Sequence, residues 1–112
     1  MPARLNFVEL PGRATTPMKT FYGSAFGFAM TDFGPTYACT LTGDVDVGIQ
    51  ADAAEATRAP LPVIQVEDLE ATLEAVKRAG GTIVKPTFSF PGGRRFHFTD
   101  PGGNELAAMQ AD

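Results

Sequence analysis

Residues 91–110, which read PGGRRFHFTDPGGNELAAMQ, decide the fold of this chain. Two strand-like runs, at 94–99 and 105–110, flank the turn-forming sequence DPGGN at 100–104. Strand-like runs separated by aspartate, proline, glycine and asparagine are typical of a β-hairpin. We therefore expect the chain to end in two antiparallel strands.

The residues before this hairpin add a strand, a helix and another strand. The apolar run 61–66 predicts a strand, and Asp68 follows it as the N-cap of a helix. Leucine and valine then recur at helical spacing on one face, until Gly80-Gly81 ends the helix. With a further strand at 82–85, the second half of the chain has the order β-α-β-β-β.

The first half of the chain repeats this order. The run 5–10 predicts a strand, and Thr16 is expected to cap a helix that ends at Gly27. The aromatic residues of this helix recur at helical spacing, so we expect them in the core: Phe21, Tyr22 and Phe26. Short strands are expected at 28–33, 37–42 and 45–50.

Corresponding landmarks of the two halves lie 53 to 55 residues apart: Phe7 and Leu61, Gly27 and Gly80, and Gln50 and Glu105. We therefore expect a single domain of 112 residues that contains two similar modules, about 4–50 and 61–110, joined by a polar connector at 51–60. The fold class is α+β, with two βαβββ modules and both helices on one face of a largely antiparallel sheet.

Composition restricts the possible partners. The net charge is −4, which argues against a nucleic acid or an anionic membrane as a partner and is compatible with a cationic or neutral small ligand. One histidine and one cysteine exclude a site of several imidazoles or thiolates from one chain. No apolar run has the roughly 20 residues that a membrane helix needs, and the N-terminal residues lack a signal-peptide core, so we expect a cytoplasmic protein.

Three segments resemble the vicinal oxygen chelate superfamily, which includes glyoxalase I, the bleomycin-resistance proteins and the extradiol dioxygenases. They are the strand at Phe7–Pro11 with the Phe21-Tyr22-Gly23 helix, the strand-to-helix turn at Val66–Glu70, and the hairpin at 91–105. The resemblance covers nearly the whole chain. It implies a U-shaped sheet around a cleft that holds a small molecule, commonly in a homodimer. Fold alone does not determine function.

The resemblance also implies where a metal would be bound. Metal-dependent members place one ligand near the start of each module's first strand and one in each module's last strand. In this chain those positions hold Phe7, Gln50, Leu61 and Glu105. Hydrocarbon side chains cannot coordinate, and two oxygen donors are fewer than the three protein ligands that such sites need. We therefore expect neither the family metal nor another cofactor.

Strand alternation extends this set of positions to other residues of the same strands. Apolar members would supply contact area, and the glutamines would donate and accept hydrogen bonds. The expected ligand-binding residues are Phe7, Gln50, Leu61, Val63, Gln65, His97 and Met109.

Two carboxylates are candidate catalytic residues. Glu105 could act as a general base, a metal ligand or a hydrogen-bond acceptor, or it could simply face water. Glu9 could pair with Glu105 or lie at the rim in water. His97 could point into the cleft or be a surface or structurally bonded residue. Arg94 and Arg95 could clamp a carboxylate, although solvated arginines are commoner.

Three functions remain open at this point. The first is a protein that binds a small organic molecule in an apolar cleft without the family metal. The second is an enzyme, of lyase, isomerase or glyoxalase-like type, with Glu105 as the base or in a rearranged metal site with Glu9, Gln50 or His97. The third is an interaction module with a vestigial cleft. We favour the first and leave open whether the protein is an enzyme.

Overall fold

The computed structural model describes residues 3–41 and 43–112. These described residues form eight strands and two helices, in the order β-α-β-β-β followed by β-α-β-β-β. The α+β class and the two βαβββ modules are therefore confirmed. The chain divides into two compact units, which we describe separately. The N-terminal unit is Phe7–Leu61, and the C-terminal unit is Pro62–Asp112 together with the residues up to Asn6.

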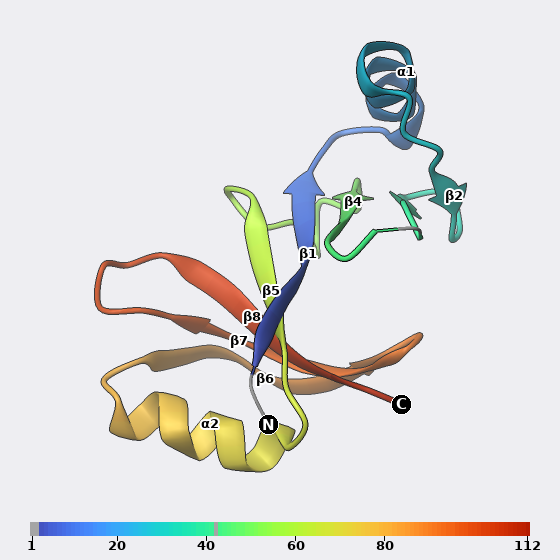
Figure 1. The fold of residues 1–112 in the computed structure, drawn as a ribbon. Helices are drawn as coiled ribbons and strands as arrows, with labels where there is room; N and C mark the ends of the chain where they lie inside the picture. The colour runs from blue at the N-terminus through green and yellow to red at the C-terminus, as the bar shows by residue number, and fades with distance from the viewer. Residues whose placement is uncertain (1–2, 42) are drawn as a thin grey trace. The chain divides into compact units, whose positions relative to one another are not determined.

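The C-terminal unit contains a four-stranded sheet covered on one face by a helix (Figure 1). Its strands lie in the order β5-β8-β7-β6, with β5 and β8 parallel and the other pairs antiparallel. The elements are β5 (Leu61–Gln65), α2 (Leu69–Arg78), β6 (Thr82–Phe90), β7 (Gly93–Thr99) and β8 (Glu105–Ala111). The expected hairpin of β7 and β8 is confirmed, and the sheet is mixed because of the parallel pair.

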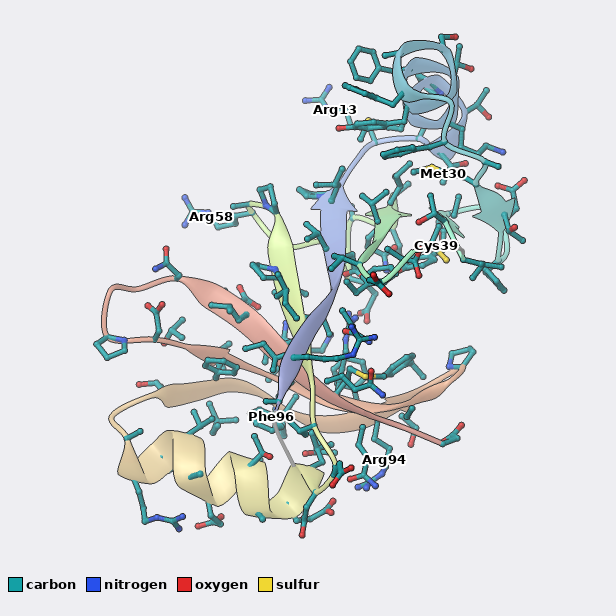
Figure 2. The ribbon with its side chains drawn as sticks, in the orientation of Figure 1. Arg13, Met30, Cys39, Arg58, Arg94 and Phe96 are labelled. Carbon is teal, nitrogen blue, oxygen red and sulfur yellow. The ribbon has the colours of Figure 1, made fainter. Side chains whose placement is uncertain are left out.

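Helix α2 begins as the sequence predicts. The Asp68 side chain accepts a hydrogen bond from the backbone N–H of Ala71 at 3.0 Å, which satisfies one of the free donors of the first turn. The apolar face of α2 packs on the sheet through Leu69, which is buried with Phe96 and Ala108. Figure 2 labels Phe96 between the sheet and α2.

Strand β6 is longer than the expected 82–85 and runs to Phe90 through Pro86. It is the last strand in the order of this unit, where the missing N–H of proline costs no ladder hydrogen bond. Its pairing with β7 slips twice, between Ile83 and Lys85 and again between Lys85 and Phe88. Each slip changes which face the following residues point to.

The N-terminal unit has the strand order β2-β3-β4-β1, with β1 and β4 parallel and the other pairs antiparallel. Strand β1 also includes the last residues assigned to the other unit. The elements are β1 (Arg4–Pro11), α1 (Thr15–Phe26), β2 (Thr31–Asp32), β3 (Tyr37–Cys39) and β4 (Asp46–Gln50). The expected strand at 28–33 shrinks to two residues, and Thr42, expected at the end of the next strand, lies outside the described residues.

Two expectations for α1 are wrong. Its N-cap is Ala14, which offers no side-chain hydrogen bond, so Thr16 lies inside the helix. Phe21 and Phe26 are 57% and 63% exposed, and Tyr22 is half-buried. The three rings contact one another, and the strands available to cover them are short, since β2 and β3 have only two and three residues.

Three further expectations are not tested by these elements. Among the described residues, no helix is long and apolar enough to cross a bilayer. The U-shaped cleft stays a prediction, and so do the cytoplasmic location and the homodimer.

Candidate functional site

The only histidine of the chain is buried on the face of the C-terminal sheet that points away from α2. Its neighbours on β7, Phe96 and Phe98, pack with α2, and alternation turns His97 to the opposite face. His97 is 1% exposed. Its Nδ1 lies 2.8 Å from Oε2 of Glu105, the first residue of β8. The hairpin therefore brings the two side chains together.

Burial determines the protonation state of the imidazole, and the contact with Glu105 determines its tautomer. Burial lowers the pKa of His97 and outweighs the hydrogen bond to Glu105, which raises it, and the nearby charges of Arg95 and Lys85 lower it further. The imidazole is therefore neutral at pH 7. Because the Glu105 carboxylate can only accept, Nδ1 carries the proton and Nε2 carries a lone pair. Nε2 is buried and has no hydrogen-bond partner among the described residues.

The strands beside β7 carry a mixture of apolar and polar side chains on the same face. The register pairs His97 with Ala107, Ala107 with Val63, and Gln65 with Met109, and directly paired residues point to one side of a sheet. We call this surface the His97 face. It comprises Val63, Gln65, Lys85, Phe88, Phe90, Arg95, His97, Glu105, Ala107 and Met109.

Asn6 joins the His97 face from the N-terminal residues of the same unit. Its Nδ2 donates to Oε1 of Gln65 at 3.2 Å and lies 3.8 Å from Sδ of Met109. Its Oδ1 is buried without a hydrogen-bond partner among the described residues. Asn6 therefore provides a second buried acceptor, after His97 Nε2, and such groups are costly unless something donates to them.

On the β6 side, two cations lie against two aromatic rings. Nζ of Lys85 is 4.5 Å from the centroid of the Phe88 ring, and Cζ of Arg95 is 5.3 Å from it. Cζ of Arg95 is also 5.6 Å from the centroid of Phe90. The Phe88 ring lies 5.8 Å from the imidazole of His97, centroid to centroid. Distances of this kind are typical of cation–π contacts.

The N-terminal unit contains its own buried carboxylate. Glu9 is 2% exposed and accepts a hydrogen bond from the Tyr37 hydroxyl at 2.8 Å. Gly48 packs closely against two aromatic side chains of this unit. A Cβ at Gly48 would come within 2.5 Å of Phe7 Cζ and 2.9 Å of the Tyr37 hydroxyl oxygen. The alternative of Glu9 as a rim residue in water is therefore wrong. Glu105 is bonded to His97, and Glu9 is bonded to Tyr37.

Comparison with known proteins identifies the family. Residues 4–108 match the family described as the Glyoxalase/Bleomycin resistance protein/Dioxygenase superfamily. This chain belongs to that superfamily. It is 30% identical over 118 aligned residues to "Putative glyoxylase CFP32" of Mycobacterium tuberculosis and of Mycobacterium bovis. The alignment covers 96% of this chain and 45% of each relative, so the chain spans about half the length of the curated relatives it matches.

Solved structures agree with the superfamily fold. A hypothetical protein from Bacillus halodurans has a TM-score of 0.81 at 12% identity, covering 100% of this chain and 96% of that one. Methylmalonyl-CoA epimerase from Mycobacterium tuberculosis has a TM-score of 0.78 at 14% identity, covering 97% and 88%. A superfamily member from Vibrio splendidus has a TM-score of 0.69 at 16% identity, covering 99% and 100%. At these identities the likeness is one of fold.

The side chains at the superfamily's four metal-ligand positions do not fit a metal. Phe7 and Leu61 have no donor atom, and the Phe7 ring packs over Gly48. Oε1 of Gln50 accepts from the backbone N–H of Asp52 at 3.0 Å, and Oε2 of Glu105 is bonded to His97. Among residues 3–41 and 43–112, no three His, Cys, Asp or Glu side chains form a group that could hold an ion.

The structure places the expected site residues of this superfamily member in both units. Glu105, His97, Val63, Gln65 and Met109 share the His97 face. Phe7, Glu9, Gln50 and Leu61 belong to the N-terminal unit, although Leu61 starts β5.

Asn6, Tyr37 and Lys85 were not among the site residues predicted from the sequence, and Arg95 was expected to be solvated. Arg94, which Figure 2 labels, pairs with the exposed Glu70 at the start of α2. Arg95 is the next residue on β7 and pairs with Met109, so alternation turns it to the opposite face. The sequence feature that could have identified Lys85 is the adjacent Pro86, because a proline inside an apparent strand indicates an irregular edge strand.

Proposed function

We propose that this protein binds a small organic molecule on the His97 face, without a metal at the superfamily positions. The ligand would donate a hydrogen bond to Nε2 of His97 and cover the apolar surface of Val63, Phe88 and Met109. This proposal keeps the small-molecule binding that the sequence favours and assigns it to residues of the C-terminal unit. It concerns only the part of the relatives that this chain spans.

One observation carries the proposal: Nε2 of His97 is a buried acceptor with no partner among the described residues. Burying such an atom unsatisfied costs on the order of 1–3 kcal/mol, which folding alone does not recover. Asn6 Oδ1 is a second atom of this kind on the same face. Convergent polar atoms among apolar side chains are typical of a ligand site.

The test is a protein-detected NMR titration with two neutral probes that differ by one methyl group, 3-hydroxybenzamide and 3-methoxybenzamide. Only the first can donate from its phenolic oxygen. We expect shift changes at Gln65, Ala107 and His97, and roughly 2- to 12-fold tighter binding of the hydroxyl probe, which corresponds to one net hydrogen bond of about 0.5–1.5 kcal/mol.

The matched variant is His97→Phe, which keeps an aromatic ring and removes the acceptor. In a folded His97→Phe protein the two probes should bind equally. Equal binding of both probes to the unaltered protein, or shift changes confined to the α2 side, would overturn the proposal.

A second candidate function is catalysis by proton transfer, as a lyase, an isomerase or a glyoxalase-like enzyme. The specific observation in its favour is a neutral imidazole that is held by a carboxylate and has an open lone pair. In this variant of the proposal His97 is the general base and Glu105 orients it, because the Glu105 oxygen already accepts the Nδ1 proton. This revises the expectation that Glu105 itself is the base.

This candidate has its own test. Pyruvate in D₂O reports proton abstraction beside a carbonyl as loss of its methyl signal in proton NMR. We expect exchange above the buffer rate with the unaltered protein, a return to the buffer rate with His97→Gln, and a smaller loss with Glu105→Gln. Exchange unchanged in His97→Gln would exclude the mechanism.

A further inference from the structure

Two buried acceptors of the His97 face lie on either side of Met109. They are Nε2 of His97 and Oδ1 of Asn6, and neither has a hydrogen-bond partner among the described residues. His97 pairs with Ala107 across the hairpin, so Met109 is its diagonal neighbour on β8, about 7–8 Å away. Sδ of Met109 in turn lies 3.8 Å from Nδ2 of Asn6. A ligand the size of one substituted benzene ring can therefore reach both acceptors.

The orientation of the Asn6 amide makes its free atom an acceptor. Nδ2 of Asn6 faces Oε1 of Gln65 at 3.2 Å and Sδ of Met109 at 3.8 Å. An amide oxygen and a thioether sulfur are both acceptors. Turning the amide over would set Oδ1 against that sulfur and lose the donor that now faces it. The Asn6 side chain therefore presents its oxygen as the unpaired atom.

Nε2 of His97 is an acceptor for a separate reason. The Glu105 carboxylate lies beside the imidazole and accepts from Nδ1 at 2.8 Å, so the neutral ring carries no proton on Nε2. Two different elements, β1 and β7, thus bring atoms of the same hydrogen-bonding character to one face. A ligand that offers acceptors at these two points leaves both atoms unsatisfied, whereas a ligand with two donors satisfies both.

Both acceptors are uncharged, so a charged donor buried against them would gain no ion pair from either. We propose that the His97 face selects an organic molecule with two uncharged hydrogen-bond donors, one donating to Nε2 of His97 and the other to Oδ1 of Asn6. This inference rests on the proposed function, names the ligand class for that same site and makes Asn6 its second specificity-determining residue. A site of this kind rejects an analogue that lacks one donor, because its own buried atom is then left unpaired.

The test uses three neutral probes in the NMR titration, at pH 7.5 and on the full chain. 3-Hydroxybenzamide carries both donors. 3-Hydroxyacetophenone has a methyl group in place of the amide nitrogen and keeps the hydroxyl, and 3-methoxybenzamide keeps the amide and blocks the hydroxyl. The matched variants are Asn6→Leu, which removes one acceptor, and His97→Phe, which removes the other. Thermal unfolding of each variant establishes that it is folded.

We expect 3-hydroxybenzamide to bind roughly 2- to 12-fold tighter than either probe with a single donor group, the range that one net hydrogen bond gives. Asn6→Leu should remove the preference over 3-hydroxyacetophenone and keep the preference over 3-methoxybenzamide. His97→Phe should do the reverse. Each variant is therefore the control for the other. If Asn6→Leu does not fold, the two hydroxyl probes on the unaltered protein still decide.

Three results would overturn the inference, and they differ in what else they affect. Equal binding of 3-hydroxybenzamide and 3-hydroxyacetophenone, with the hydroxyl preference intact, would mean that the ligand does not donate to Asn6 and would leave the proposed function standing. Loss of both preferences in each folded variant would mean a general disturbance of the face rather than two separate contacts. Absence of the hydroxyl preference in the unaltered protein would overturn both proposals.

Discussion

Nδ1 of His97 lies 2.8 Å from Oε2 of Glu105, and this contact orients the only imidazole of the chain. The carboxylate accepts the Nδ1 proton, so the lone pair of Nε2 points to the other side of the ring. A carboxylate that fixes a histidine tautomer in this way is a familiar orienting device in metal and catalytic sites. Here the atom it exposes has no partner among the described residues.

Glu105→Gln should lower the pKa of His97 still further. A glutamine oxygen can accept the same hydrogen bond, but the negative charge that favours the imidazolium is lost. An NMR titration of the single histidine measures this directly. Glu70→Gln, which removes an exposed carboxylate paired with Arg94, is the control and should leave the His97 pKa in place. A pKa that rises in Glu105→Gln would contradict the assignment.

Burial of His97 should make stability fall with acidification. The unfolded imidazole titrates near pH 6.5, and the folded one titrates below that value, so the unfolded state binds more protons in between. The contribution of His97 is therefore fully present above about pH 6.5 and is lost as the pH falls towards the folded pKa. Urea midpoints at pH 7.5 and pH 5.5 should differ more for the unaltered protein than for His97→Phe. An equal drop in both proteins would refute this reading.

Gly48 should not tolerate a side chain. An added Cβ would come within 2.5 Å of the Phe7 ring and 2.9 Å of the Tyr37 hydroxyl oxygen, so Gly48→Ala should cost about 1–3 kcal/mol of unfolding free energy. Gly23→Ala is the matched control, because its Cβ would make an ordinary 3.5 Å contact with the backbone oxygen of Phe28 and gain about 0.5–1 kcal/mol of helix propensity in α1. Chemical denaturation measures both. Similar values for the two variants would mean that Phe7 does not pack over Gly48.

The two helix starts offer another comparison. Asp68→Ala should cost about 1 kcal/mol, because the Asp68 side chain caps α2. Thr16→Ala should cost no capping energy, because Ala14 occupies the N-cap of α1. Urea denaturation of the two variants measures the difference. If Thr16→Ala cost as much as Asp68→Ala, the first helix would begin where the sequence alone predicted.

The sequence predicted the order of the elements well because that order is encoded locally. Turn residues at 100–104, the cap at Asp68 and the repeat of the two halves all act over a few residues. The exposure of Phe21 and Phe26 was missed because it depends on how much sheet is available to cover α1. Strand β2 has two residues and β3 has three, and no local pattern predicts that shortage.

The residues of the candidate site were likewise predicted where the sequence pattern is local and missed where their position depends on strand pairing. Alternation on regular strands was sufficient to group Glu105 and Met109 with Gln65 on one face. Lys85 was missed because two register slips around Pro86 decide which way it points. Neither the burial of His97 nor its bond to Glu105 could be read from the spacing, since both depend on how β7 and β8 pair. The contact of Asn6 with Gln65 joins residues 59 positions apart.

The most direct test of the central claim is a long-range ¹⁵N–¹H NMR spectrum of untagged protein, in which His97 gives the only imidazole signals. At pH 7.5 we predict a neutral ring with the proton on Nδ1, and an Nε2 resonance that moves when 3-hydroxybenzamide is added. A ring protonated on Nε2, or an Nε2 resonance that stays fixed while the probe binds, would contradict the account.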